Sequence, residues 1–173
     1  MGSRFVIAML AASWLTSGRV QPLLAQRRPS ARPAEPLIAT PLHAVALNDL
    51  SFGTVLPGIP LSVPVGDPRA GQFEVLGSVG ESVRVEFGLP AALTAHDGSL
   101  LPMTFSGSDG FASYTRGHAV AGFVFNPQAP VITTLGPDGR LFLRMGASVF
   151  PGRPQVSGPY RATITLTVFD LGS

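Results

Sequence analysis

The chain contains no cysteine and no lysine among its 173 residues. The absence of cysteine excludes disulfide bonds, zinc–thiolate sites and a cysteine nucleophile. All 12 basic residues are arginines, and 10 of them follow residue 25, together with all 10 acidic residues. The chain beyond residue 25 is therefore near neutral, and the high overall isoelectric point does not indicate a nucleic-acid-binding surface.

Glutamate is also scarce, whereas 20 glycines and 17 prolines interrupt the chain every few residues. No stretch after residue 25 keeps a helical period over ten residues, and residues 90–95 predict at most one helical turn. No repeat of fixed period is present, which argues against solenoids and propellers. The composition favours an all-β protein.

The N-terminus carries an export pattern. Residues 5–15 (FVIAMLAASWL) form an apolar run behind Arg4, and the small residue Ala25 offers a cleavage position. The run is too short to span a bilayer, which takes about 20 apolar residues. A buried helix is the alternative, but the segment that follows gives it nothing to pack on. Residues 1–25 are therefore predicted to be a secretory signal peptide, and the mature chain to be exported to the periplasm, the outer surface or the medium.

Residues 26–42 contain four prolines and three arginines, which predicts a flexible leader. Residues 43–173 then show short apolar segments separated by turn residues, as in a sandwich or barrel. Val83, Val85 and Phe87 alternate with Arg84 and Glu86, for example. We predict a single antiparallel β-sandwich of about eight to ten strands, the first at residues 44–52 and the last at residues 160–169.

One turn stands out. Residues 131–135 and 140–145 flank Gly136-Pro137-Asp138-Gly139, which predicts a β-hairpin.

Four motifs carry a resemblance that covers residues 37–171. They are Leu50-Ser51-Phe52-Gly53-Thr54-Val55, Ala70-Gly71-Gln72-Phe73-Glu74-Val75-Leu76-Gly77, Met145-Gly146-Ala147 and the run from Gly158-Pro159-Tyr160 to Val168. This set resembles an uncharacterised family of exported bacterial proteins, a domain of unknown function. Its nearest described relatives by pattern are spore-coat protein U domains and chaperone–usher pilin subunits.

The resemblance implies an immunoglobulin-like, pilin-like sandwich that is left incomplete and is filled by a strand from a neighbour. Expected partners are then like subunits or a periplasmic chaperone and usher. The chain lacks the disulfide of classical pilins, and Phe169 would have to serve as the C-terminal aromatic that contacts a chaperone. No catalytic residue carries over.

Two sets of candidate site residues follow. The candidates for strand exchange or assembly are Leu37, Ile38, Leu42, Tyr160, Ile164, Leu166, Val168 and Phe169. Candidates for surface binding are Phe111, Tyr114 and Arg116, in a Gly- and Ser-rich stretch where an exposed aromatic beside an arginine could bind a sugar or a protein. The alternative, which we favour for this stretch, is a strand edge with its aromatic in the core. The apolar residues 37–47 could be donated to another subunit or fold onto their own sheet, and for residues 44–52 we favour the second.

Other chemistry finds little support. The histidines His43, His96 and His118 are dispersed without a metal-ligand spacing, and no serine-nucleophile motif occurs. We interpret the acidic residues Glu74, Glu81 and Glu86 as side chains on the solvated faces of strands. We expect no cofactor, no metal and no enzymatic activity. The expected function is a non-enzymatic structural or adhesive surface subunit of fimbrial type; the alternative is a monomeric extracellular module that binds carbohydrate or protein, with an assembled hydrolase site a distant third.

Overall fold

The computed structural model describes residues 40–116 and 121–172. In these residues the chain forms thirteen strands and no helix, so no helix there could cross a membrane. The predicted signal peptide and most of the predicted leader lie outside the described residues. The strands are β1 His43–Asn48, β2 Leu61–Val63, β3 Gly71–Leu76, β4 Ser82–Gly88, β5 Ala92–Ala95, β6 Leu100–Thr104, β7 Gly110–Ser113, β8 Gly122–Phe125, β9 Val131–Thr134, β10 Arg140–Met145, β11 Ala147–Val149, β12 Tyr160–Arg161 and β13 Thr165–Asp170.

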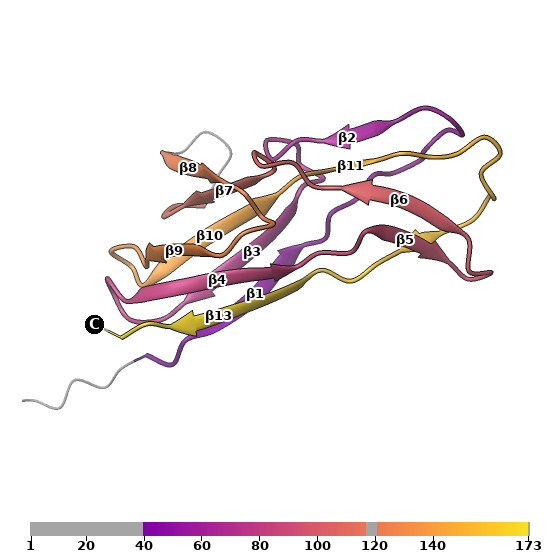
Figure 1. Ribbon diagram of the computed structural model, residues 1–173. Coiled ribbons are helices and arrows are strands. Elements are labelled where there is room, and N and C mark those ends of the chain that lie inside the picture. Colours follow the sequence, from indigo (N-terminus) through magenta and orange to yellow (C-terminus); the bar gives the residue numbers. More distant parts are fainter. Residues whose placement is uncertain (1–39, 117–120, 173) are drawn as a thin grey trace, which may run out of the picture. The chain divides into compact units, whose positions relative to one another are not determined.

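All pairings are antiparallel and form three sheets (Figure 1). The strand orders are β1-β3-β10-β7-β8, β12-β5-β6-β11-β2 and β13-β4-β9. Three pairs of strands, β4–β5, β10–β11 and β12–β13, follow one another with at most three residues between them, so the thirteen segments make ten extended runs. The predicted all-β sandwich is confirmed.

The sheets meet through a common apolar core. Phe87 of β4 stacks on Phe125 of β8, with ring centroids 5.9 Å apart, and meets the edge of Phe73 of β3 at 5.7 Å. These contacts join the three-stranded sheet to the five-stranded sheet β1-β3-β10-β7-β8. Along β4, Val83 and Val85 are fully buried while Arg84 and Glu86 keep contact with solvent, as the period-two pattern predicts.

The predicted hairpin is wrong, although its turn is present. Gly139 has a φ of 67°, and the Gly136 amide donates to the Arg140 carbonyl. However, β9 pairs with β4, whereas β10 pairs with β3 and β7. Burial explains the separation: β10 is buried on both faces and needs a central place, while β9 exposes Ile132 and suits an edge.

Three other local predictions need correction. Residues 92–95 form strand β5, where at most one helical turn was expected. The first strand ends at Asn48, before the buried Phe52. Glu74 is buried and forms an ion pair with Arg140, with Oε1 and Nη1 3.0 Å apart, so it does not belong to a solvated face.

Candidate functional site

Two sheet edges lie on the same side of the sandwich. Among the described residues β1 pairs only with β3, and β13 pairs only with β4, so each is the outer strand of its sheet. The two strands approach each other where β1 begins and β13 ends, as Figure 1 shows. Each strand therefore presents an unpaired row of backbone groups on this side of the sandwich, which is where a further strand could add.

Beyond this approach an open groove of about 1040 Å³ separates the chain that follows β1 from the chain that precedes β13. One rim is formed by Ala46, residues 48–55 and Pro57, and the other by residues 155–164. The volume is at the upper end of the range of roughly 300–1,000 Å³ that small-molecule pockets occupy. It is large enough for several side chains of an extended peptide.

The groove opens onto the core. Phe73, Leu101 and Met103 line it and are themselves buried, so they form its floor. The half-buried apolar side chains Leu50, Val55, Leu93, Tyr160 and Ile164 pack against that core and also line the groove. An apolar floor beside unpaired main chain fits an extended segment whose alternate side chains are apolar, because the rims offer main-chain hydrogen-bonding groups and the floor accepts side chains.

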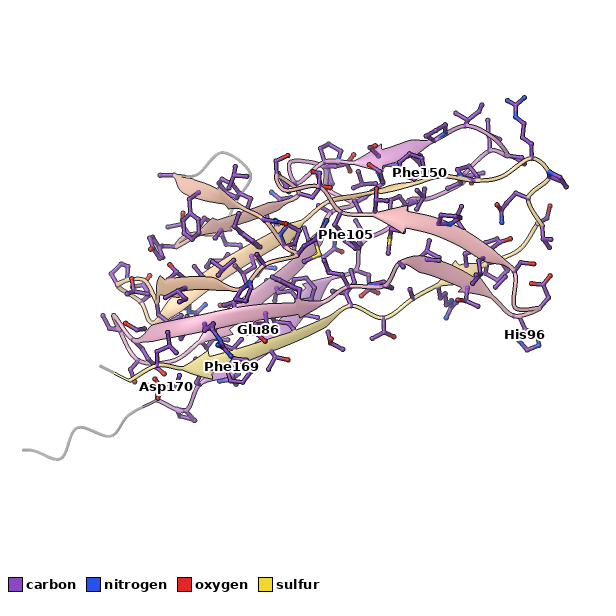
Figure 2. The ribbon with its side chains drawn as sticks, in the orientation of Figure 1. Glu86, His96, Phe105, Phe150, Phe169 and Asp170 are labelled. Atoms are coloured by element: carbon purple, nitrogen blue, oxygen red, sulfur yellow. The ribbon has the colours of Figure 1, made fainter. Side chains whose placement is uncertain are left out.

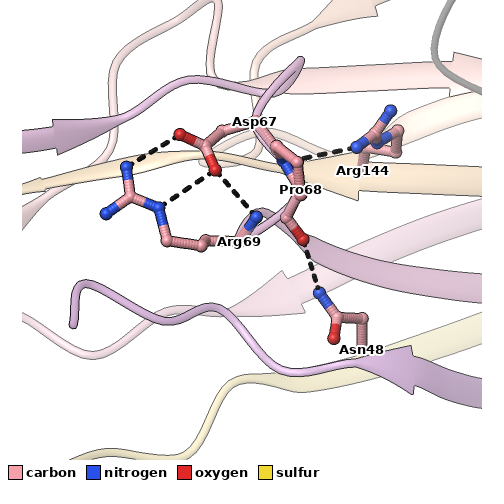
Figure 3. A network of polar contacts seen from close by, with 5 residues as sticks. All are labelled: Asn48, Asp67, Pro68, Arg69 and Arg144. Carbon is pink, nitrogen blue, oxygen red and sulfur yellow. Dashed lines mark hydrogen bonds and ion pairs between the residues drawn. The ribbon is translucent and has the colours of Figure 1, made fainter.

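The first rim is tied to the β2–β3 loop (Figure 3). The side-chain amide of Asn48 donates to the carbonyls of Pro68 at 3.1 Å and Ala70 at 2.9 Å. The Ser51 amide donates to the Arg69 carbonyl at 2.9 Å. These bonds position the chain at the point where it leaves β1, so the rim is held without being paired in a sheet.

The same loop carries an ion pair. Arg69 donates from Nη2 to Asp67 Oδ2 at 2.8 Å and from Nε to Oδ1 at 3.0 Å, and its amide also donates to Oδ1. Arg144 Nη2 donates to the Asp67 carbonyl at 3.2 Å. The side-chain bonds of Arg69, followed by its amide, lower the pKa of Asp67 from 3.8 to about 2.

This shift gives a pH prediction. Because the pKa of Asp67 is lower in the folded protein, the stabilisation it gives the loop is present above pH 3.8 and is lost as the pH falls through about 2. Substitution Arg69→Ala should raise the pKa of Asp67 toward 3.8, which carboxyl-carbon NMR titration would measure. The matched control is Asp97, whose pKa is lowered mainly by the Ser99 amide and should not move. An Asp67 midpoint unchanged by R69A would contradict the assignment.

The second rim is organised by Gln155. Its Nε2 donates to the Tyr160 hydroxyl at 2.7 Å and to the Leu100 carbonyl at 3.1 Å, while its Oε1 accepts from the Gly152 amide at 2.9 Å. The Tyr160 hydroxyl donates in turn to the Val156 carbonyl at 2.7 Å. One glutamine thus fastens the segment before β12 to the start of β6.

The candidates for strand exchange fall into three places. Tyr160 and Ile164 line the groove, and Leu166 and Val168 pack half-buried against the core from β13. Leu42 packs against the core of its own domain. Phe169 points outward, with the Arg84 guanidinium 4.7 Å from its ring centroid, and Figure 2 shows it near Asp170 and the chain end. Leu37 and Ile38 lie outside the described residues.

The surface-binding candidates do not form one exposed row. Phe111 is half-buried in β7, between Arg144 of β10 and Val124 of β8. Tyr114 and Arg116 follow β7 and are exposed, and Arg116 lines a second, smaller cavity of about 130 Å³. Phe111 therefore lies in a strand, as the favoured alternative predicted. Of the three candidates, Tyr114 and Arg116 are the ones exposed to solvent.

No group of three His, Asp or Glu side chains that could hold a metal occurs within residues 40–116 and 121–172. His96 lies at the tip of the β5–β6 turn, at the opposite end of Figure 2 from Asp170. His118 lies outside the described residues.

Sequence reasoning missed several residues of the groove. Asn48 and Gln155 hold the rims, and Leu93 and Met103 line the interior. A polar residue that directly follows an apolar strand, as Asn48 does, is a weak signal because most such residues are solvated.

A scan against protein-family models matches none, and searches of the curated proteins and of the solved structures find no match for this chain. The fold and the groove define an antiparallel β-sandwich with an open side.

Proposed function

We propose that this protein is an exported, non-enzymatic surface subunit, pilin-like or coat-like, that assembles by accepting a strand in its groove. The observation that carries the proposal is the groove of about 1040 Å³, which has a buried apolar floor and lies beside two outer strands, β1 and β13. The export pattern of residues 1–25 and the four-motif resemblance support the same conclusion. The partner is a like subunit or a periplasmic chaperone.

The donated strand has constraints. Residues from His43 onward already pair with β3, and Leu42 packs on its own core, so any segment given to a neighbour must come from upstream. Leu37 and Ile38 are the large apolar side chains there. Each such side chain that becomes buried contributes about 1.5–3 kcal/mol, and main-chain bonds along the two edges add to this.

The test uses the protein recovered after export. Size-exclusion chromatography is expected to show oligomers, or a monomer whose unfolding temperature rises when a peptide of residues 26–42 is added. A ligand at 100 times its Kd stabilises by about 2.7 kcal/mol, which a thermal scan detects easily. A peptide of the same composition in scrambled order is the control. A stable monomer that gains nothing from either peptide would count against the proposal.

A second candidate function is a monomeric binding module for carbohydrate or protein. Exposed Tyr114 and Arg116 at the end of β7 favour it, because an aromatic ring beside a guanidinium is a frequent recognition pair. A glycan array probed with the exported protein would separate the two: specific binding lost in Tyr114→Ala supports the module, and no binding weakens it.

A further inference from the structure

The strand β8 is an outer strand of the five-stranded sheet β1-β3-β10-β7-β8, at the edge opposite β1. Its sequence, Gly122-Phe123-Val124-Phe125, carries no charge. Phe125 is buried, but Phe123 is 36% exposed and Val124 is 58% exposed. An uncharged outer strand with exposed apolar side chains is a template for pairing with another chain.

The other outer strands are protected or already discussed. The strands β2 and β9 each begin directly after a proline, namely Pro60 and Pro130. Proline has no N–H to offer a ladder, and its presence beside an outer strand discourages pairing. The strands β1 and β13 flank the groove, and β12 lines it. Among the described outer strands away from the groove, β8 is thus the one without a proline at its start, and it carries no charge.

We infer that β8 pairs with β8 of a second copy, antiparallel, around a twofold axis perpendicular to the sheet. A twofold axis perpendicular to the sheet places the outer strand antiparallel to its own copy, so the unpaired N–H and C=O groups of the two strands face each other. The β1-β3-β10-β7-β8 sheets of the two copies then form one continuous sheet. No like charges oppose each other in this pairing, and Phe123 and Val124 of both copies lose exposure to water. This contact is separate from the groove and does not depend on the proposed function.

The expected affinity is low. A four-residue strand buries far less than the roughly 1,200 Å² of total area that stable interfaces need. The dimer should therefore form at high protein concentration. If copies are also linked by another contact, the raised effective concentration strengthens the pairing.

Sedimentation velocity across micromolar to near-millimolar concentration tests the inference, using the exported protein with Ile164→Arg to remove groove-mediated assembly. In that background a monomer–dimer equilibrium is expected. Adding Val124→Arg should weaken dimerisation at least tenfold, because it places an arginine on each side of the pairing axis. The matched control is Ile132→Arg, at a 70% exposed position on the proline-flanked strand β9, which should dimerise normally.

Thermal unfolding of each variant verifies that it is folded, and Val124→Thr, which keeps the branched shape without charge, should retain the dimer. Three results would overturn the inference: a monomer at every concentration without the additional substitution, dimerisation unaffected by V124R, or equal loss in V124R and I132R.

Discussion

Replacing Ile164 with arginine is expected to weaken strand binding in the groove by about tenfold to hundredfold while the sandwich stays folded. Ile164 is half-buried, lines the groove and lies in the three residues between β12 and β13 that belong to neither strand. Loss of one buried apolar side chain costs about 1.5–3 kcal/mol, and each 1.4 kcal/mol is a factor of ten in affinity. Titration of the residue 26–42 peptide by calorimetry would measure the change.

Ile132→Arg is the matched control for this prediction. It introduces the same side chain at an exposed position on β9, which does not line the groove. I132R should bind the peptide like the unsubstituted protein. If I164R also bound it with unchanged affinity and still assembled, the groove could not be the acceptor.

Leu143→Ala is expected to destabilise the fold by about 2–5 kcal/mol, a large part of the 5–15 kcal/mol that holds a typical domain folded. Leu143 is fully buried on β10, where it is paired across the sheet with Phe73 of β3 and Ala112 of β7. Truncation would leave a cavity between strands that cannot close around it. Urea unfolding followed by circular dichroism gives the free energy.

The control for the core is Leu100→Ala. Leu100 lies on β6 but is 59% exposed, so its truncation should change the free energy of unfolding by no more than about 0.5 kcal/mol. If L143A and L100A lowered the free energy of unfolding equally, β10 could not be a central strand of the sandwich core.

Local chemistry accounts for what could be predicted from the sequence. Alternation identified Val83 and Val85 as core residues, and the predicted turn at Gly136-Pro137-Asp138-Gly139 forms, with Gly139 at a φ of 67°. In these cases the deciding interactions lie within a few residues of one another. The last strand, predicted at residues 160–169, shows the same alternation: Ile164, Leu166 and Val168 are half-buried against the core.

Pairing partners could not be predicted, because they depend on distant segments. The break in the last strand at residues 162–164 lies opposite a break at residues 89–91 of its partner run, which contains Pro90. Proline cannot donate to the ladder, so both runs are interrupted together. The alternating apolar pattern around Ile164 does not reveal this interruption.

The groove itself escaped prediction for a related reason. Its rims come from residues 48–55 and 155–164, and its floor from β3, β5 and β6, so no local pattern contains it. The motifs that resemble pilin-like subunits suggested an incomplete sandwich, but neither Asn48 nor Gln155, which fasten the rims, belongs to those motifs.

Hydrogen–deuterium exchange of the exported protein, alone and in its assembled or peptide-bound form, tests the strand-acceptor groove most directly. The account predicts that amides at residues 52–56, and the edge amides of β12 and β13, exchange quickly in the isolated subunit and become strongly protected on assembly. Amides of β3 and β10, which are inner strands of the five-stranded sheet β1-β3-β10-β7-β8, should be protected in both forms. Unchanged exchange along both rims in an assembled sample would contradict the account.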